Sequence, residues 1–297
     1  MESCEVARAM AGREKVTVRD IVRAKQRGER IVMVTAYDYI TAKLVDEAGV
    51  DMILVGDSLG MVVLGLPSTH QVTLEDMERH TAAVARAQPR ALIVADMPFM
   101  SYEASTRDAV LNAGRLIAAG ADAVKIEGGA SYSDTIRALV RAGIPVVAHV
   151  GLTPQRYKLL GGYRLAGKTA SEAMEVIREA IGAEEAGAFA VVIEFTAWEV
   201  AREITRKLSI PTICIGSGPY CDGQVLVIHD LLGLTPTPPP FAKKYVDLAA
   251  IIRRAVSEYA SDVRNGRFPG EGMYWGMKRG EYEKLQRLIN EQAGSGD

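Results

Sequence analysis

The sequence predicts an α/β fold: a (β/α)8 TIM barrel with an additional N-terminal helix and a C-terminal helical extension. Short runs rich in Val, Ile, Leu and Ala alternate with longer amphipathic patterns, as parallel strands buried on both faces alternate with covering helices. Four helical patterns end in Ala-Gly just before the next run, at Gly49, Gly120, Gly143 and Gly187, where a left-handed residue readily ends a helix. Seven or eight such units follow one another without a break, as in a β/α barrel.

The expected strands are short apolar runs, and the helical patterns lie between them. The strands cover residues 31–36, 51–56, 91–95, 122–126, 145–150, 189–194, 210–215 and, more weakly, 224–230. The helices cover residues 40–48, 74–87, 105–119, 131–142, 171–186 and 197–208. A doubly wound open sheet is the alternative arrangement. No GxGxxG motif follows the first run, which weakens a dinucleotide-binding version of that alternative.

We expect one domain over residues 1–297, with short additions at both ends. Residues 1–16 are interpreted as a loosely ordered leader, and a helix is expected at 17–27 with Thr17 as its N-cap. The stretch TPTPPPF, residues 235–241, is typical of an extended Pro-rich connector.

The C-terminal helical extension is expected over residues 243–297. It contains a long helical pattern at 245–264 and an apolar tail at 271–293. Because so much apolar surface is unusual outside a core, we expect it to pack on the barrel or on a neighbouring subunit.

Composition and charge argue against several functional classes. The net charge of −2 and the charged fraction of 24% provide no overall field for nucleic acid or an anionic membrane. No apolar stretch reaches the roughly 18 residues of a membrane span, and the N-terminus lacks a signal-peptide pattern. Cys4, Cys214 and Cys221 are too few and too scattered for a disulfide framework. The last two are interpreted as packing residues or as residues without a specific role, and a reducing cytoplasm is the expected location.

Acidic residues stand at the ends of four apolar runs. Asp57, Asp96, Glu127 and Glu194 would therefore meet at the C-terminal rim of the barrel, where β/α barrels carry their active sites. Charge there is costly unless it binds something, and Mg²⁺ prefers oxygen ligands. Asp57, Asp96 and Glu127 are interpreted as a site for one divalent cation. Alternatively, each caps a helix or pairs with a basic residue.

Other polar residues at this rim could contact a ligand. Lys125 lies two residues before Glu127 on the same strand face, so it can bind a substrate carboxylate, steady developing negative charge, or pair with Glu127. Glu194 suits a general base near neutral pH, although a structural carboxylate bound by backbone N–H groups is its alternative. His149 and Ser58 could hydrogen-bond a ligand, or serve as a packing histidine and a turn serine.

The chain resembles one enzyme family along most of its length, from about residue 17 to 265. The resemblance rests on TAYDYITAKLVDEAGVDMILVGDSLGMVVLG, THQVTLEDMERHTAAV, ADMPFMSY, KIEGG, HVGLTPQ, LGGYRLAGKT and GPYCDGQVLVIHDLLGL. These stretches are similar to those of 3-methyl-2-oxobutanoate (ketopantoate) hydroxymethyltransferases. The early motifs alone indicate only the phosphoenolpyruvate/pyruvate barrel superfamily, whereas HVGLTPQ, LGGYRLAGK and CDGQVLVIHD narrow the resemblance to this family.

The resemblance implies a Mg²⁺-dependent (β/α)8 enzyme of pantothenate and coenzyme A biosynthesis. Such enzymes transfer a one-carbon unit from the co-substrate 5,10-methylenetetrahydrofolate to 3-methyl-2-oxobutanoate, giving 2-dehydropantoate. By the family pattern, Asp57, Asp96 and Glu127 surround the metal, while Ser58 and Lys125 contact the keto acid. The family forms large homo-oligomers, often decamers, which would suit the apolar C-terminal tail.

The family pattern also implies a base and a mechanism. Mg²⁺ chelated by the keto acid acidifies its C3–H, Glu194 removes that proton, and the enolate attacks the methylene carbon while Lys125 steadies the oxyanion. The chain departs from the pattern where FTAWEVAREIT follows Glu194 in place of Cys-Val-Pro, and where IGSGP replaces IGAGP. Both departures border the expected pterin end of the pocket, and residues 266–297 fit the family less closely.

Two other functions remain as alternatives. The first is a lyase or mutase of the same superfamily that acts on a 2-oxo acid or phosphoenolpyruvate. No KKCGH-type loop of the isocitrate-lyase relatives occurs in the chain. The second is a non-catalytic oligomeric binding protein, which would not need a base such as Glu194 beside a metal site.

Overall fold

The computed structural model describes residues 14–293, and the chain divides into two compact units. The first unit extends to Val246 and the second begins at Asp247, close to the predicted start of the helical extension. Most of the predicted leader, residues 1–16, lies outside the described residues. The helix expected after it is present as α2 (Val18–Arg27), and Thr17 is its N-cap in a capping box with Asp20.

The first unit contains a closed barrel of eight parallel strands. Each strand pairs with the next, and β1 pairs with β8, which rules out the doubly wound open sheet. The final predicted run, 224–230, divides between β8 and the short helix α11 (Ile228–Leu231). The strands are β1 (Ile31–Thr35), β2 (Met52–Val55), β3 (Leu92–Asp96), β4 (Ala123–Glu127), β5 (Val146–Gly151), β6 (Ala190–Glu194), β7 (Thr212–Ile215) and β8 (Gly223–Leu226).

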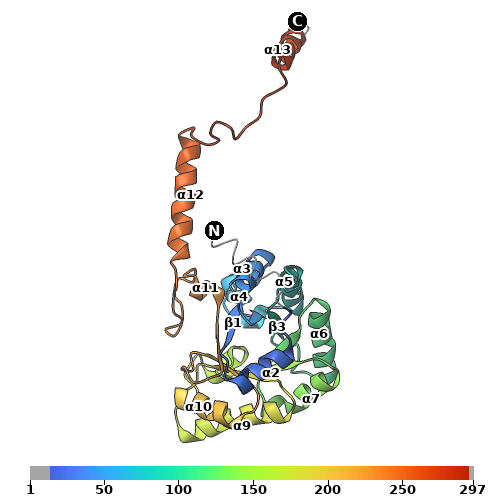
Figure 1. The fold of residues 1–297 in the computed structure, drawn as a ribbon, viewed down its shortest axis with the longest axis vertical. Coiled ribbons are helices and arrows are strands. Elements are labelled where there is room, and N and C mark those ends of the chain that lie inside the picture. Colours follow the sequence, from blue (N-terminus) through green and yellow to red (C-terminus); the bar gives the residue numbers. More distant parts are fainter. Residues whose placement is uncertain (1–13, 294–297) are drawn as a thin grey trace. The chain divides into compact units, whose positions relative to one another are not determined.

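Helices connect the strands and surround the barrel (Figure 1). The six predicted helices are confirmed to within two residues at each end, as α3 (Tyr39–Glu47), α5 (Leu74–Arg86), α6 (Thr106–Ala118), α7 (Ser133–Arg141), α9 (Ala170–Glu185) and α10 (Trp198–Lys207). Shorter elements lie in the loops, namely α4 (Leu59–Val62), α8 (Tyr157–Leu160), η1 (Thr69–Gln71), η2 (Ala130–Tyr132) and η3 (Pro154–Arg156).

The predicted helix-ending glycines behave as expected. Each of the four has a positive φ, between 85° at Gly143 and 110° at Gly120. An L side chain is strained in this conformation, so glycine ends the helix and turns the chain toward the next strand at little cost. These turns set the regular spacing that brings every strand end to the same rim.

Alternate residues of each strand point into the barrel or toward the helices. Met52 and Leu54 belong to the inner cluster of buried apolar side chains, whereas Ile53 and Val55 belong to the outer cluster beneath the helices. Ile21 of α2 joins the inner cluster, so this helix closes the N-terminal end of the barrel. The C-terminal end is therefore the one that can admit a ligand.

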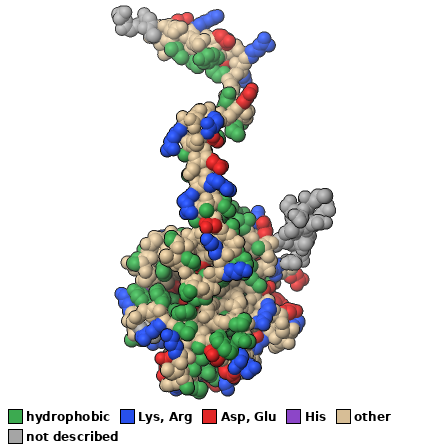
Figure 2. Space-filling model, turned by 90° about the vertical axis from the view of Figure 1, so that its left-hand side faces the viewer, with side chains coloured by type: hydrophobic (Ala, Val, Ile, Leu, Met, Phe, Trp, Pro, Cys, Tyr) green, Lys and Arg blue, Asp and Glu red, His purple; other side chains and the backbone are tan. Residues whose placement is uncertain are grey.

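The second unit consists of α12 (Leu248–Arg264) and α13 (Glu281–Ala293). The first of these begins three residues later than predicted, because the Asp247 side chain accepts a hydrogen bond from the backbone N–H of Ala250 and caps it. Many apolar side chains of this unit are exposed, and some gather on the surface of α13 in Figure 2. Examples are Ile251, Ile252, Val256, Tyr259, Trp275, Tyr282, Leu288 and Ile289. The expected packing of this surface stays a prediction.

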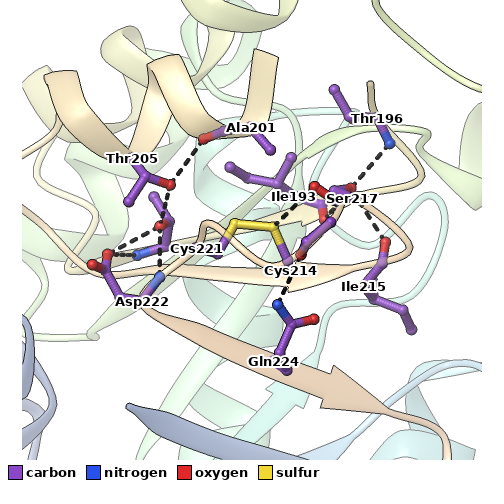
Figure 3. The surroundings of a disulfide bond; sticks show 12 residues. Ile193, Thr196, Ala201, Thr205, Cys214, Ile215, Ser217, Cys221, Asp222 and Gln224 are labelled. Atoms are coloured by element: carbon purple, nitrogen blue, oxygen red, sulfur yellow. Dashed lines mark hydrogen bonds between the residues drawn. A yellow bond between two sulfur atoms is a disulfide. The ribbon is translucent and has the colours of Figure 1, made fainter. Parts of the chain in front are cut away.

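The interpretation of two cysteines is wrong. Cys214 and Cys221, expected to be packing residues, form a buried disulfide across the loop between β7 and β8 (Figure 3). The loop turns back between neighbouring strands and brings the two Cα atoms within 5.7 Å, a separation that the sequence spacing of seven does not reveal. Cys4 lies outside the described residues. Among residues 14–293, no helix is long and apolar enough to cross a membrane.

Candidate active site

A cavity of about 520 Å³ is lined by residues at the C-terminal ends of the strands. The strand ends bring all seven predicted site residues into its wall, although they are spread over more than 130 positions of the sequence. These are Asp57, Ser58, Asp96, Lys125, Glu127, His149 and Glu194.

A buried ion pair crosses between β3 and β4 in this cavity. Lys125 Nζ lies 2.9 Å from Asp96 Oδ1, so its partner is Asp96 and not the Glu127 named as the alternative. Burial lowers the pKa of Lys125, but the negative charges of Asp96, Asp57 and Glu127 outweigh it and raise that pKa well above its ordinary value. Lys125 is therefore positively charged at neutral pH and faces a cluster of carboxylates.

Asp57 lies beside this pair. Its backbone N–H donates to Asp96 Oδ2 at 3.0 Å, and its Oδ2 accepts from Gln155 Nε2 at 2.9 Å. Burial, together with the charges of Asp96 and Glu127, raises the pKa of Asp57 to about 8. Asp57 is therefore mostly protonated at neutral pH, and a cation bound beside it would favour its ionised form.

Gln155 and Tyr102 fix Glu127, and neither was among the predicted site residues. The backbone N–H of Gln155 donates to Glu127 Oε2 at 2.9 Å, and the Tyr102 hydroxyl donates to Gln155 Oε1 at 2.8 Å. The same hydroxyl accepts from the Glu127 backbone N–H at 3.2 Å. Both residues end stretches that carry the family resemblance, Gln155 in HVGLTPQ and Tyr102 in ADMPFMSY, but neither is an acidic or basic residue at a strand end.

His149 lies between two carboxylates of the site. Its Nε2 is 3.2 Å from Glu194 Oε2, and its Nδ1 is 3.5 Å from Glu127 Oε1. Burial and the charge of Lys125 lower the pKa of His149, but Glu127 and Glu194 outweigh them and raise it to about 9. A positively charged His149 therefore holds Glu194, whose side chain remains 20% exposed and can be reached from the cavity.

Ser58 and Ser217 both stand beyond strand ends but have different surroundings. Ser58 lines the cavity, with its Oγ 2.9 Å from the Tyr37 hydroxyl. Ser217 Oγ donates to the Ile193 carbonyl and accepts from the Thr196 N–H, so it holds the β6 and β7 loops together (Figure 3). Ser217 belongs to the frame of the site, whereas Ser58 can touch a ligand.

The donor chemistry of the site fits a hard divalent cation. Asp57 and Asp96 are buried carboxylates, and Asp96 Oδ1 already pairs with Lys125 Nζ at 2.9 Å. Across residues 14–293, no three His, Cys, Asp or Glu side chains are arranged to hold one ion together. Mg²⁺ commonly takes only one or two protein carboxylates and completes its shell with water or substrate oxygens. Asp57 and Asp96, which lie next to each other, supply two such carboxylates.

Comparison with known proteins gives a family match over most of the chain. The family model described as ketopantoate hydroxymethyltransferase matches residues 15–271. The 3-methyl-2-oxobutanoate hydroxymethyltransferase of Ignicoccus hospitalis is 63% identical over 262 residues, covering 88% of this chain and 100% of that protein. The enzyme of the same name from Staphylothermus marinus is 62% identical over 271 residues, covering 91% and 100%.

Solved structures add the fold. The phosphoenolpyruvate phosphomutase of Streptomyces platensis subsp. rosaceus superposes with a TM-score of 0.59 at 16% identity, covering 94% of this chain and 98% of that one. At this identity the likeness bears on the barrel and not on the chemistry.

Proposed function

Since the chain belongs to the ketopantoate hydroxymethyltransferase family, we propose that it transfers a hydroxymethyl group from 5,10-methylenetetrahydrofolate to 3-methyl-2-oxobutanoate, giving 2-dehydropantoate. One observation carries the proposal at the level of residues. A buried set of carboxylates with one lysine lies in the same cavity as Glu194, a carboxylate that remains accessible. Identities above 60% over most of the chain favour this activity over the lyase or mutase alternative.

Asp57 and Asp96 would hold a Mg²⁺ ion, with Glu127 as a further candidate. A bound Mg²⁺ supplies Lewis-acid polarisation of the substrate's keto oxygen, which acidifies the neighbouring C–H bond. Glu127 is already held by Gln155 and His149, so it would act directly on the ion only if those contacts loosened.

The chain's own groups bind and orient the keto acid. Lys125 offers a charged ammonium group, and Ser58 offers a hydroxyl in the same cavity. The lysine is stabilised in its charged form by the carboxylates, so it is ready to bind a carboxylate or to steady negative charge that develops on oxygen. The apolar barrel around them excludes water, which strengthens these interactions.

Glu194 removes the proton from C3 of the keto acid. His149 holds the Glu194 carboxylate at 3.2 Å, which limits its rotation and keeps it at the cavity wall. The C3 carbon left with an electron pair forms a bond to the methylene carbon of the donor, and both bonds from that carbon to the donor nitrogens N5 and N10 break. Water supplies the hydroxyl oxygen of the product. The proton taken from C3 and the proton lost by water end on the two nitrogens, which gives tetrahydrofolate. His149 acts here as a positioning residue, because its polar contacts are to Lys125, Glu127 and Glu194.

The proposal extends to assembly and location. We expect a cytoplasmic homo-oligomer, of which a decamer is the family's common form. The exposed apolar side chains of the second unit support an assembly, because such surface is normally covered in a soluble protein.

Direct detection of the product tests the proposal. Purified protein with Mg²⁺, 3-methyl-2-oxobutanoate and 5,10-methylenetetrahydrofolate should form 2-dehydropantoate, measured by mass spectrometry. Asp134→Asn is a matched control, since this side chain is 91% exposed on α7, and it should retain the rate. Folded protein that forms no product under these conditions would contradict the proposal.

A further inference from the structure

The cavity has a charged half and an apolar half. Neighbouring strands in the closed barrel follow sequence order, so β2–β4 lie across the cavity from β6–β8. The first group carries Asp57, Asp96 and Lys125, whereas Ile215 and Val225 line the second. Glu194 ends β6, the strand of the apolar half that pairs with β5 and is therefore nearer to β4 than β7 and β8 are. A keto acid in the charged half leaves the apolar half for the second reactant.

A buried carboxylate interrupts this apolar half. Asp230 lies in α11, just beyond β8; it lines the cavity and is only 6% exposed. Within the described residues its carboxylate makes no hydrogen bond and no ion pair, unlike the carboxylates across the cavity. A buried charge without a partner is costly, so this side chain is suited to a ligand that donates hydrogen bonds.

Thr235 supplies a second polar group without a partner. It opens the Pro-rich segment 235–241 and lines the same cavity. Its Oγ1 is buried and has no hydrogen-bond partner in the described part of the chain. A hydroxyl can donate or accept, so Asp230 and Thr235 together offer acceptors and one donor.

Two aromatic side chains form a wall beside these groups. The rings of Phe195 and Phe241 are tilted by 43°, with centroids 5.5 Å apart. A flat ring fits between two others only if their centroids are about 7 Å apart. The Phe195 and Phe241 centroids are closer than that, so the two rings form one continuous wall and leave no slot between them. The Pro-rich segment, expected to be a plain connector, thus carries a ring of the cavity lining.

The backbone holds both rings at some cost. Phe195 has a φ of +38°, a conformation that is strained for a bulky residue. The ring of Phe241 lies directly on Gly216, where an added Cβ would approach within 2.6 Å. The disulfide between Cys214 and Cys221 closes the loop that carries this glycine (Figure 3). Strain and close packing at a cavity wall indicate a functional constraint.

We propose that Asp230, Thr235 and the Phe195–Phe241 wall form the subsite for the heterocyclic head of the one-carbon donor, a reduced pterin. This inference rests on the proposed function and deepens it. A pterin presents a ring N–H and an amino group side by side, and one carboxylate accepts both hydrogen bonds. Its flat face packs on the phenyl rings, and Thr235 bonds a remaining ring atom. The head then lies across Glu194 from the keto acid.

Titration calorimetry in the presence of Mg²⁺ and 3-methyl-2-oxobutanoate tests the subsite, with tetrahydrofolate and 6-methyltetrahydropterin as probes. Asp230→Asn should weaken both probes at least tenfold relative to the keto acid, because one acceptor becomes a donor. Asp134→Asn is the matched control and should change neither Kd. Equal affinities for wild type and Asp230→Asn, or a loss with tetrahydrofolate alone, would overturn the placement of the pterin head.

The aromatic wall has its own variants. Phe241→Leu should weaken both probes at least tenfold, and Phe241→Tyr should restore them. Phe195→Gly removes the ring and relieves the strain of the positive φ. The midpoint of its thermal unfolding should therefore stay close to that of the wild type, while its affinity for both probes should fall at least tenfold, as in Phe241→Leu. Unchanged probe affinity in Phe241→Leu and Phe195→Gly would overturn the wall. A wild type that binds the keto acid but neither probe would instead contradict the proposed donor.

Discussion

Lys125 Nζ lies 2.9 Å from Asp96 Oδ1, and the two side chains are only 6% and 4% exposed. This ion pair joins β3 to β4 in the cavity wall. Asp57 and Glu127 lie nearby, and Lys125 offsets their negative charge less than it offsets that of Asp96. The raised pKa of Asp57 reflects its burial and this crowding of carboxylates, and a bound divalent cation would stabilise the ionised form of Asp57.

Replacing Lys125 by Met should strongly destabilise the protein without Mg²⁺. Breaking a buried pair leaves an uncompensated charge, which costs about 3–5 kcal/mol. The pKa of Lys125 is raised, so the contribution is fully present near neutral pH and is lost only in strongly alkaline solution. Urea unfolding measures the difference. Lys43→Met, at an exposed position on α3, should stay within about 0.5 kcal/mol; an equal effect of both changes would contradict the role of the pair.

Mg²⁺ affinity should depend most on Asp57 and Asp96. Asp57→Asn or Asp96→Asn should weaken binding at least about tenfold, because each removes a charged oxygen donor. Glu127→Gln should have a smaller effect, since Gln155 and His149 already engage that carboxylate. Calorimetric titration with Mg²⁺ alone gives the affinities. A larger loss with Glu127→Gln than with the two aspartates would reverse the assigned ligands.

Mg²⁺ binding should release a proton from Asp57 near neutral pH. The pKa of Asp57 is about 8 without metal, so the group is mostly protonated at about pH 7 and must ionise to bind a cation. Affinity should rise with pH until about 8 and then level off. Calorimetry in buffers of different ionisation enthalpy counts the protons. Asp57→Asn should abolish most of the release; full release in that variant would assign the proton elsewhere.

The disulfide should stabilise the first unit. Cys214→Ala should cost about 2–3 kcal/mol, the loop-closure value for so short a segment. The chain has three cysteines, and the disulfide uses two of them, so one free thiol remains per chain. A thiol titration of the denatured, unreduced protein should therefore count one thiol. Cys4→Ala serves as the control and should leave the free energy of unfolding unchanged. Three thiols before reduction would show that the bond does not form in solution.

The fold and the charged half of the site could be predicted because their signals are local. Apolar runs, Ala-Gly helix ends and the carboxylates at four strand ends are all visible within a few residues, and barrel closure then fixes where they meet. The partner of Lys125 could not be predicted from the sequence. Glu127 lies two residues away on the same strand and Asp96 lies on a neighbouring strand, so the Lys125 side chain could pair with either carboxylate. The register of β3 against β4, which sets Asp96 opposite Lys125, decides between them.

The apolar half was largely invisible in the sequence for a different reason. Phe241 reaches the cavity through a Pro-rich segment that was expected to be a connector, and Asp230 is the last residue of the run 224–230 that was expected to be a strand. After β8 the chain turns into the four-residue helix α11, and this turn brings Asp230, and later Phe241, to the cavity wall. A helix this short has no periodic pattern by which the sequence could predict the turn. The disulfide was missed likewise, since only the return of the β7–β8 loop brings Cys214 to Cys221.

Hydrogen exchange at C3 of the keto acid tests the central claim most directly. The protein with Mg²⁺ should wash deuterium out of C3-deuterated 3-methyl-2-oxobutanoate in ordinary water, as followed by NMR. Glu194→Gln should abolish the exchange while the keto acid still binds, because the amide cannot accept the proton. Wild-type protein that is folded and binds the keto acid without any exchange, or a Glu194→Gln variant that exchanges at the wild-type rate, would contradict the account.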